Sequence, residues 1–471
     1  MNLGAILAFA LILRMTVFLI WPSVYFADEI YQIQEPAHKL AFGSGVLATW
    51  DFRSGLRSWV LPTVLAGIMK TTAWMGGGSA GYTFAIALFA SILSLFAVWF
   101  AYAWCRRTVN TSCGLLAAFV AAAWYEFVYF GPHPFSEFIS GNILLPVIYF
   151  GSLAGEDNSK DKWRLIAVGI GLGIVVGLRL QMAPAVFLAG IWIIRGNWRK
   201  RVGPVLAGAL AAILVFGIAD TVSWGVPFHS YYASVQQNVL KDRASHFGTM
   251  SFFGALYHLF GRVGPLILLA LVGVRRSPIL GWLCLAILVP HLLIPHKEYR
   301  YVYPMLPLLL TLAVMGLNDT FVFLSEKLNL NKLALHKNRL LAAAFLMLSL
   351  LLALRFPFWA QGTGYLKAFR YISQTPAICG IGIEQGDWQI AGGYTWLHRP
   401  IPIFLAPNVD GLTALAVDLN AIVIPTGQNL PSGSFFKIRC WQNACLYKRE
   451  GDCRLEHKES TIEEVIPREQ E

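Results

Sequence analysis

Charged residues are scarce in this chain. Only 13% of its 471 residues are Asp, Glu, Lys or Arg, whereas 56% are hydrophobic and the mean hydropathy is +0.56. A soluble domain carries about a quarter charged residues. This shortage excludes a disordered chain, a collagen-like repeat, a coiled coil and a small disulfide-bonded scaffold. It indicates a protein that crosses a lipid bilayer several times.

Acidic residues are fewer than basic ones, at 26 against 37, so the net charge is +11. In a soluble protein such an excess would suggest a nucleic acid as the partner. Here the Lys and Arg residues fall in short loops between apolar runs, where they set the orientation of membrane helices. The sequence therefore predicts a lipid bilayer as a partner and no nucleic acid.

Eleven apolar runs are candidates for membrane-spanning helices, each of which needs about 20 mostly apolar residues. The first is expected to be retained, because residues 3–20 lack the basic start and the A-x-A site of a cleavable signal peptide. The pair 164–178 and 180–195 is short, and we expect a kink around Arg179 and Pro184. The predicted spans are 3–21, 82–104, 113–130, 134–154, 164–178, 180–195, 202–224, 251–273, 278–294, 301–318 and 340–356.

Basic residues between these runs decide the orientation. With eleven spans and a cytoplasmic N-terminus, five basic clusters all fall on the cytoplasmic side. This agreement requires that residues 58–75 do not cross the membrane. We expect them to form a helix that lies in the membrane interface, within a first outer loop at about 22–81. The clusters are Arg106/Arg107, Lys160/Lys162/Arg164, Arg195/Arg199/Lys200/Arg201, Arg275/Arg276 and Lys332/Lys337/Arg339.

Residues 357–471 differ in kind from the apolar part at 1–356. Short β-like runs, AICGIGIE, IPIFL, AIVIP, FFKIRC and ACLYK, alternate with Gly, Pro and Asn. We predict a small α/β domain here, on the outer side after the last span. Four of the seven cysteines lie in it, and an oxidising outer face favours one or two disulfides, of which Cys440–Cys445 is the simplest. Zinc is the rival, but C-x4-C-x7-C without paired His lacks the usual ligand spacing, so no metal is predicted.

Polar residues of the membrane part gather in segments on the predicted outer side. Charges at membrane level are costly and tend to mark pathways or sites. Taken singly, an acidic pair could cap a helix, the histidines could be structural, and an arginine at a kink could satisfy freed carbonyls. Five segments on one side instead predict a polar cavity that opens outward. Among these residues are Asp28, Glu29, Glu35, Asp51 and Arg57, then His133 and Glu137, Arg179, Asp220 and His229, and His296, Lys297, Glu298 and Arg300.

Two runs in the first outer loop, DEIYQIQEPAHKLAFGSG and TWDFRSGLRSWVLP, resemble the first luminal loop of the glycosyltransferase family 22 mannosyltransferases. The shared pattern is an acidic pair, then Glu-Pro-x-His, a Gly, Thr-Trp-Glu/Asp, and Arg-Ser with a Pro shortly after. Further along, SWGVPFHSYY is similar to the family's Trp-x-x-Gly-x-Pro loop, and HKEYRYVYPMLPLL closely resembles its His-Lys-Glu-x-Arg signature. One departure concerns the acceptor: where the family commonly has an Arg-Thr-x-Ser-Asn run, this chain reads GPHPFSE.

The resemblance implies a GT-C membrane glycosyltransferase, an all-α polytopic protein with a small C-terminal α/β domain on the extracytoplasmic side. Such enzymes are expected to move a sugar, here mannose, from a polyprenyl or dolichyl phosphate to a hydroxyl of a glycan or glycolipid acceptor, with inversion. No cofactor or metal is implied, because Lys and Arg side chains can supply the countercharge.

The candidate residues suit this chemistry. An acceptor hydroxyl is a poor nucleophile and needs a carboxylate base, so Asp28 is predicted as the base, with Glu29 orienting Asp28 or the acceptor. The leaving phosphate develops charge that cationic groups placed beforehand stabilise. The residues predicted to bind that phosphate are Arg57, His296, Lys297, Arg300 and Arg179. Those assigned to the acceptor side are His133, Glu137 and His229.

Two alternatives stay open at this point. A GT-C transferase could use another lipid-phosphate-linked sugar, such as aminoarabinose or glucose, and a transporter or lipid flippase would need no chemistry at all. Against a transporter, the spans show no internal repeat, which many transporters have. The predicted location is a bacterial inner membrane with a periplasmic active face, and the alternative is an endoplasmic reticulum membrane with a luminal one.

Overall fold

The computed structural model describes residues 2–153, 159–264, 266–328, 336–428, 430 and 434–470. The chain divides into two compact units. The first comprises Met1–Met15 and Ala90–Arg355, and the second comprises Thr16–Phe89 and Phe356–Glu471. The second unit thus takes in the first outer loop together with the C-terminal segment. A separately folding domain that begins at residue 357 stays a prediction.

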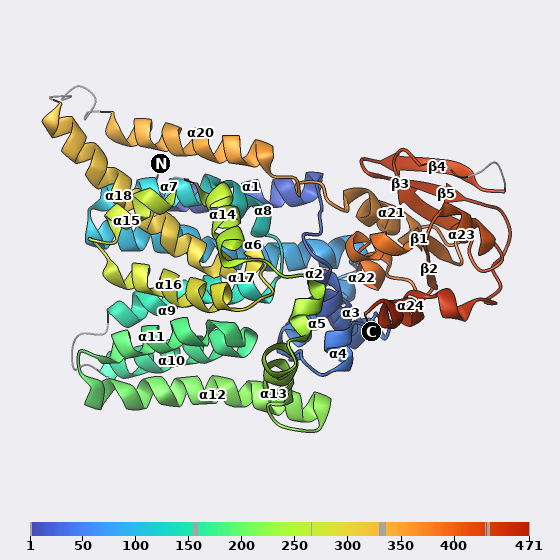
Figure 1. The fold of residues 1–471 in the computed structure, drawn as a ribbon, viewed down its shortest axis with the longest axis horizontal. Coiled ribbons are helices and arrows are strands. Elements are labelled where there is room, and N and C mark those ends of the chain that lie inside the picture. Colours follow the sequence, from blue (N-terminus) through green and yellow to red (C-terminus); the bar gives the residue numbers. More distant parts are fainter. Residues whose placement is uncertain are drawn as a thin grey trace. The chain divides into compact units, whose positions relative to one another are not determined.

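The first unit is helical, and its long helices lie side by side (Figure 1). It also holds the short turns η2 (Leu180–Met182), η3 (Gln236–Leu240), η4 (Arg243–Phe247) and η5 (Tyr303–Met305). Its helices, including the parts of α1 and α6 that fall in this unit, are α1 (Leu3–Ile20), α6 (Ser79–Thr108), α7 (Thr111–Ala123), α8 (Tyr125–Phe130), α9 (Ser136–Ser152), α10 (Ser159–Leu178), α11 (Ala183–Ile194), α12 (Trp198–Trp224), α13 (His229–Val235), α14 (Phe252–Val263), α15 (Leu266–Gly273), α16 (Pro278–Leu293), α17 (Tyr299–Val302), α18 (Leu306–Lys327) and α20 (Lys337–Arg355).

Helices occupy every predicted span, which confirms a multi-span helical membrane protein. Within the described ranges, five stretches are long and apolar enough to cross a bilayer, and a sixth if the bent pair α14 and α15 counts as one span. Shorter apolar helices lie at Thr111–Ala123, Leu180–Ile194 and Pro278–Leu293. The number of membrane spans, eleven, stays a prediction. The five stretches are Leu3–Ile20, Ser79–Thr108, Trp198–Trp224, Tyr299–Lys327 and Lys337–Arg355.

Arg179 and Trp124 each mark a break between helices of the first unit. Arg179 has an extended backbone (φ −146°, ψ 101°) between α10 and η2, which confirms the predicted kink. Trp124 has φ −65° and ψ 124° and separates α7 from α8, so the predicted span 113–130 is two helices rather than one. Non-helical backbone at membrane depth is tolerated only where protein or water satisfies its polar groups.

Helices α10 and α12 pack backbone against backbone. A Cβ added to Gly169 would lie 2.1 Å from the carbonyl oxygen of Val205, and one added to Gly208 would lie 2.1 Å from that of Ile166. Only glycine fits at both positions. Small residues at such contacts let membrane helices approach closely and gain packing energy.

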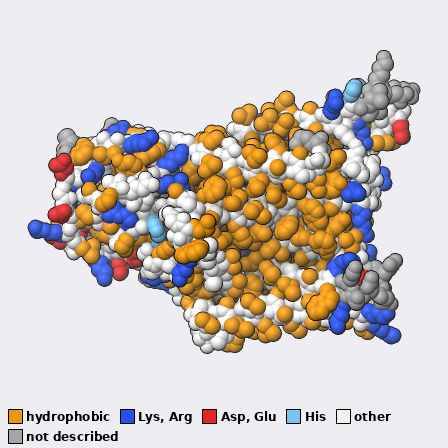
Figure 2. All heavy atoms as spheres, turned by 180° about the vertical axis from the view of Figure 1, so that it is seen from behind, with side chains coloured by type: hydrophobic (Ala, Val, Ile, Leu, Met, Phe, Trp, Pro, Cys, Tyr) orange, Lys and Arg blue, Asp and Glu red, His pale blue; other side chains and the backbone are white. Residues whose placement is uncertain are grey.

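The face of the first unit that Figure 2 shows is largely apolar, with basic residues at one end. On α12 one residue per turn is exposed and aliphatic, namely Leu206, Leu210, Leu214, Ile218 and Val222. Such a stripe suits contact with lipid chains. Exposed basic residues include Arg106, Arg107, Arg195, Arg199, Lys200, Arg275, Arg276 and Arg339. The side chain of Lys160 and all of Lys332, from the predicted clusters, lie outside the described residues.

The second unit contains a five-stranded mixed sheet in the order β2-β1-β3-β5-β4. Strands β2, β1 and β3 are parallel, and β5 runs antiparallel to β3 and β4. All five predicted β-like runs are strands: β1 (Ile381–Glu384), β2 (Ile403–Ala406), β3 (Ala421–Pro425), β4 (Phe436–Trp441) and β5 (Ala444–Lys448). The helices and turns around them are α2 (Ala27–Glu29), η1 (Ile30–Gln34), α3 (Glu35–Phe42), α4 (Trp50–Arg53), α5 (Val60–Trp74), α21 (Thr363–Ser373), η6 (Gln385–Ile390), α22 (Gly393–Leu397), α23 (Val409–Ala414), η7 (Lys458–Ser460) and α24 (Ile462–Glu469).

The first outer loop shares a core with the sheet. Val24, Ile30, Tyr31 and Val46 are buried in the same cluster as α21 and one face of β1, β2 and β3. The hydroxyl of Tyr31 donates to the carbonyl of Trp388 at 2.8 Å. Burial of this apolar surface, at about 25 cal/mol per Å², is what joins the two parts of the second unit. Helix α5 lies in this loop, and its predicted interfacial position stays a prediction.

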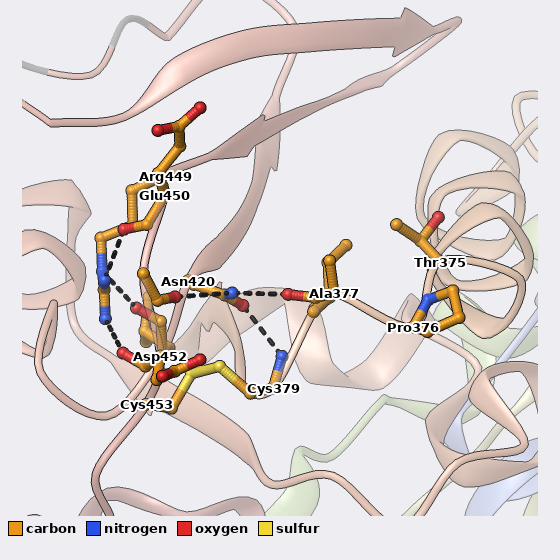
Figure 3. Close-up of a disulfide and its surroundings, with 12 residues drawn as sticks. Thr375, Pro376, Ala377, Cys379, Asn420, Arg449, Glu450, Asp452 and Cys453 are labelled. Atoms are coloured by element: carbon orange, nitrogen blue, oxygen red, sulfur yellow. Dashed lines mark hydrogen bonds between the residues drawn. A yellow bond between two sulfur atoms is a disulfide. The ribbon is translucent and has the colours of Figure 1, made fainter.

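Two disulfides connect the four cysteines of the sheet region, and one of them is the predicted Cys440–Cys445 bond. Cys440 pairs with Cys445 between opposite positions of β4 and β5, and Cys379 pairs with Cys453. Figure 3 shows the second bond beside Asn420, whose Oδ1 accepts from the backbone N of Cys379 at 2.9 Å. All four cysteines are therefore occupied as disulfides rather than as zinc ligands.

The two disulfides should differ in their contribution to stability. Cys379 and Cys453 are 74 residues apart, whereas Cys440 and Cys445 are 5 apart. A crosslink over a longer loop removes more conformational entropy from the unfolded chain. We expect the double variant Cys379→Ser/Cys453→Ser to lower the free energy of unfolding by about 2–5 kcal/mol, and Cys440→Ser/Cys445→Ser to lower it less. Thermal unfolding with limited proteolysis of the C-terminal segment measures both, and equal losses would refute the ranking.

Candidate active site

A buried group of ion pairs in the first unit joins three segments that are far apart in sequence. Glu137 lies in the first turn of α9, Arg179 at the break after α10, and Arg300 in α17. Nη2 of Arg179 lies 3.1 Å from Oε1 of Glu137, and Nε of Arg300 lies 3.8 Å from the same oxygen. All three side chains are almost completely buried, and charges so placed require partners of opposite sign.

Glu298 extends this group on the other side of Arg300. Its Oε2 accepts a hydrogen bond from Nε of Arg300 at 2.6 Å, and its Oε1 accepts from Nη2 at 3.2 Å. Burial alone would raise the pKa of Glu298, but the charges of Arg300 and His296 lower it to about 2. Arg300 is therefore held by an ionised carboxylate in a two-point contact, the geometry in which arginine binds carboxylates most firmly.

His296 behaves as a cation in this arrangement. Its Nδ1 lies 2.7 Å from the carbonyl oxygen of Gly248, and its Nε2 lies 2.8 Å from Oε1 of Glu298. Both partners only accept hydrogen bonds, so the ring donates from both nitrogens, which requires the protonated form. In agreement, the hydrogen bond to Glu298 raises the pKa of His296.

Lys297 adds a further positive charge. Its Nζ donates to the backbone carbonyls of Met250, at 2.8 Å, and Ile294. Arg179, Arg300, His296 and Lys297 thus contribute four cationic groups, against the two carboxylates of Glu137 and Glu298. This set, which we call the cationic cluster, has more positive than negative charge and so suits an anionic ligand.

Tyr301 fixes the direction of both arginines. The guanidinium carbons of Arg179 and Arg300 lie 5.4 and 5.2 Å from the centre of its ring. A cation over an aromatic face is attracted by the ring quadrupole. Its hydroxyl also donates to Oε1 of Glu298 at 3.1 Å. One aromatic side chain thus links three members of the cationic cluster.

The three residues assigned to the acceptor side take different positions. Glu137 contacts the arginines that were assigned to the phosphate, so its place is in the cationic cluster. His133 is buried with its ring 4.7 Å from that of Tyr129. His229 begins α13, and its ring lies 5.8 Å from that of Trp224.

The acidic pair belongs to the second unit. Glu29 is buried, and its two carboxylate oxygens accept from the backbone N of Tyr25, at 3.5 Å, and from Nε2 of Gln34, at 3.4 Å. Asp28 is more exposed than Glu29. Both residues precede a π-helical turn, η1, a rare geometry that occurs often at functional sites.

Arg57, predicted to bind phosphate, lies beside a carboxylate. Its Nε donates to Oδ2 of Asp51 at 2.8 Å, and Oδ1 of Asp51 accepts from the backbone N of Phe52. Asp51 is fully buried, whereas the side chain of Arg57 keeps 28% of its exposure. A guanidinium has five N–H donors, so one arginine can bind more than one partner.

Two important carboxylates were not among the predicted site residues. Glu298 was within the quoted HKEYR run, but its two-point contact with Arg300 needs the folded loop. Glu35 is fully buried, and it accepts from the backbone N and the hydroxyl of Thr395 at 2.6 and 2.7 Å and from the N of Val46 at 2.9 Å. The Glu-Pro-x-His pattern contains Glu35 and could have signalled it.

No group of three or more His, Cys, Asp or Glu side chains is placed to hold a metal ion in the part of the chain that the structure describes.

Among solved structures, the chain is similar to ArnT from Cupriavidus metallidurans bound to undecaprenyl phosphate. The TM-score is 0.56 at 15% sequence identity, and the match covers 94% of this chain and 97% of ArnT. At this identity the likeness concerns the fold, which is that of the GT-C membrane glycosyltransferases.

Curated relatives carry the name GPI mannosyltransferase 3. The protein from Yarrowia lipolytica is 26% identical over 412 residues, which are 80% of this chain and 72% of the relative. Those from Drosophila melanogaster and Schizosaccharomyces pombe are 24% and 26% identical, and the matches cover 66% and 62% of this chain. The chain spans only 55% and 64% of the length of these two relatives.

Residues 5–388 match the Alg9-like mannosyltransferase family, glycosyltransferase family 22. This range includes the acidic pair, the cationic cluster and the first strand of the sheet. The resemblance seen in the loop motifs is thereby confirmed, and a transporter without chemistry is set aside. The chain belongs to the Alg9-like mannosyltransferase family and is a multi-pass membrane glycosyltransferase.

Proposed function

We propose that this enzyme transfers mannose, with inversion, from a polyprenyl or dolichyl phosphate to a hydroxyl of a glycan or glycolipid acceptor. The observation that carries the proposal is the surplus of positive charge in the cationic cluster. Arg179 and Arg300 are buried beside Glu137 and Glu298, and Lys297 and the protonated His296 add positive charge next to them. The phosphate of the donor would bring an anion to these four cations.

The cationic cluster suits the leaving group of this reaction. As the bond between sugar and phosphate breaks, negative charge grows on the phosphate oxygen. Donors that are fixed in advance stabilise this charge without reorganising during the reaction. Arg300 and Arg179 are fixed by Glu298, Glu137 and Tyr301, so we assign both to the phosphate, with His296 and Lys297.

Asp28 is our proposed base. The oxygens of Glu29 already accept from the backbone N of Tyr25 and from Gln34, which favours a role for Glu29 in holding the turn. Asp28, the more exposed carboxylate, is better suited to take the proton of an acceptor hydroxyl. The proton passes to Asp28, the hydroxyl oxygen bonds to the sugar carbon, and the lipid phosphate leaves with the bonding electrons.

The names of the relatives bear on the acceptor, and the disulfides bear on the compartment. The name GPI mannosyltransferase 3 among the relatives favours a glycolipid acceptor. The disulfides favour an oxidising outer face, whether a bacterial periplasm or the lumen of the endoplasmic reticulum. We keep the bacterial inner membrane as the proposed location, while the named relatives are eukaryotic.

Replacement of Asp28 tests the base. Asp28→Asn keeps the shape of the side chain but cannot take a proton, so turnover with polyprenyl-phosphate mannose should fall about 10²–10⁴-fold while donor binding is retained. Turnover and donor affinity of the purified variant measure the two effects. If Asp28→Asn keeps near-normal turnover and Glu29→Gln loses turnover, then Glu29 is the base.

Replacement of Arg300 tests the phosphate site. Arg300→Lys keeps the charge but loses the planar fork, and Arg300→Ala removes both. We expect kcat/KM for the donor to fall about 10²–10³-fold in Arg300→Ala and by an intermediate factor in Arg300→Lys. Arg276→Ala is the matched control, because Arg276 also forms a two-point contact with a carboxylate, Asp319, but is half exposed. A similar fall in the control, or an unchanged donor KM in both Arg300 variants, would remove the cationic cluster from the proposal.

A further inference from the structure

The Glu-Pro-x-His pattern of the first outer loop has no part in the proposed reaction, yet both of its polar residues are fully buried. Glu35 and His38 lie in α3, which packs beside α22 in the second unit (Figure 1). A buried carboxylate and a buried imidazole are costly unless each has a specific partner. Both residues have their partners in α22 and in the residue that ends it.

Glu35 binds α22 with its carboxylate. Its Oε1 accepts from the backbone N and the hydroxyl of Thr395, and its Oε2 accepts from the backbone N of Val46. A Cβ added to Gly393, which has a φ of +53°, would lie 2.6 Å from Cδ of Glu35. Only glycine allows this close approach, so the start of α22 is fitted to the carboxylate.

His38 holds the residue after α22. Its Nδ1 lies 2.6 Å from the carbonyl oxygen of Ser44, and its Nε2 lies 3.1 Å from Nδ1 of His398. The carbonyl can only accept, so Nδ1 of His38 carries a hydrogen. Burial lowers the pKa of His38 to about 4. At pH 7 its Nε2 therefore has no hydrogen and accepts from Nδ1 of His398.

The backbone of His398 is in an unfavourable conformation. It has a φ of 49° and a ψ of 35°, the left-handed geometry that glycine adopts most easily at the end of a helix. A residue with a large side chain at such a position suggests that the side chain is used. Here the ring of His398 contacts His38 and lies edge-on against Phe42, also of α3, at 4.7 Å between ring centres.

Tyr31 makes a third contact of the same kind. Its hydroxyl donates to the carbonyl of Trp388 at 2.8 Å, and its ring lies edge-on to that of Trp388. Tyr31, Glu35 and His38 follow one another at helical spacing, which places them along one side of a helix. We call these three residues the clasp, and all three bind the segment 388–398.

The segment that the clasp binds is itself firmly held. Trp388 and Leu397 are buried in the core that also contains one face of β1, β2 and β3. The hydroxyl of Tyr82 donates to the carbonyl of Thr395. The segment 388–398 is therefore a well-packed support for the helix that carries the clasp.

The same helical stretch carries Asp28. Helix α2, the π-helical turn η1 and α3 follow one another without a break, because the residues at both junctions have helical backbone angles. Asp28 thus lies about two helical turns before Glu35. Contacts that fix α3 therefore restrict where the carboxylate of Asp28 can lie.

We propose that Tyr31, Glu35 and His38 are positioning residues, which hold Asp28 where it can take the proton of the acceptor hydroxyl. This inference rests on the proposed function. The clasp touches neither donor nor acceptor in this scheme and acts through the stretch Ala27–Phe42. A displacement of about 1 Å at a reacting group can lower the rate about 10²-fold, so a loosened clasp should lower kcat and leave donor binding unchanged.

Two substitutions loosen the clasp in different ways. Glu35→Gln keeps only one acceptor oxygen, so either Thr395 or Val46 loses its acceptor. His398→Gly removes the ring that binds His38 and suits the left-handed backbone. With polyprenyl-phosphate mannose and a mannose-terminated glycolipid, we expect kcat to fall about 10- to 10²-fold in Glu35→Gln and less in His398→Gly. The KM for the donor should stay within about twofold in both.

The decisive comparison combines Glu35→Gln with Asp28→Asn. If the clasp acts through Asp28, an enzyme that has already lost this base loses no further turnover when Glu35 is replaced. If Glu35 serves the fold alone, the two losses multiply.

Asp418→Asn is the matched control. Asp418 is a buried carboxylate of the same unit that also accepts from backbone N groups, those of Glu456 and His457, at 2.5 and 2.9 Å. These partners lie near the C-terminus rather than in the stretch Ala27–Phe42. Its kcat should equal that of wild type. Melting temperatures of the purified full-length variants separate a folding defect from a change at Asp28.

The outcomes distinguish the two levels of the proposal. A fall in kcat with an unchanged donor KM, and no further fall in the double variant, supports positioning. Multiplied losses in the double variant, a donor KM that rises as kcat falls, or an unchanged kcat in Glu35→Gln would overturn the positioning role while the proposed function stands. If Glu35→Gln does not fold, His398→Gly decides by the same criteria.

Two further results bear on the level below. If Asp28→Asn keeps its turnover, Asp28 is not the base, and the positioning role fails with that assignment. If wild type itself does not transfer mannose from the lipid phosphate, the proposed function fails and the positioning role fails with it.

Discussion

Charge pairing in an apolar surrounding is the constraint on which the helical unit depends. Glu137, Arg179, Arg300 and Glu298 come from three distant segments, and each would be too costly to bury without the others. Their mutual contacts therefore bring together the start of α9, the break after α10 and the turn α17. Replacing such a network by apolar residues is often neutral or stabilising, so its presence suggests a use beyond stability.

That use follows from the imbalance of charge. Two carboxylates hold the arginines in fixed directions, and Lys297 and the protonated His296 bring further positive charge to the cationic cluster. Phosphate is the anion that a lipid-linked sugar supplies, and its negative charge grows during transfer. The same contacts that make burial of the arginines tolerable would thus prepare them for the leaving group, with no reorganisation at the moment of reaction.

Structural features that depend on a short stretch of the chain could be predicted from the sequence. The strands followed from short β-like runs between Gly, Pro and Asn, and the Cys440–Cys445 bond from a hairpin spacing. The kink followed from a charged residue, Arg179, shortly before Pro184. The pairing of Cys379 with Cys453 was not predicted, because a 74-residue separation carries no local signal.

Features that arise from tertiary contacts could not be predicted. The break at Trp124 depends on Ser349, more than 200 residues away, and no glycine or proline marks it. Glu137 contacts Arg179 and Arg300, which come from distant segments, and its neighbours in sequence do not reveal these contacts. The first outer loop shares its core with the sheet through Tyr31 and Val46, which hydropathy alone does not reveal.

The most direct measurement is the configuration of the sugar before and after transfer. Purified enzyme in lipid nanodiscs would receive polyprenyl-phosphate mannose, labelled with carbon-13 at the anomeric carbon, and a mannose-terminated glycolipid, and nuclear magnetic resonance would report the new bond. Direct displacement of a phosphate held by the cationic cluster predicts mannose on the acceptor with inverted configuration and one released lipid phosphate for each bond formed. Retained configuration, or transfer of another lipid-phosphate-linked sugar in preference to mannose, would contradict it.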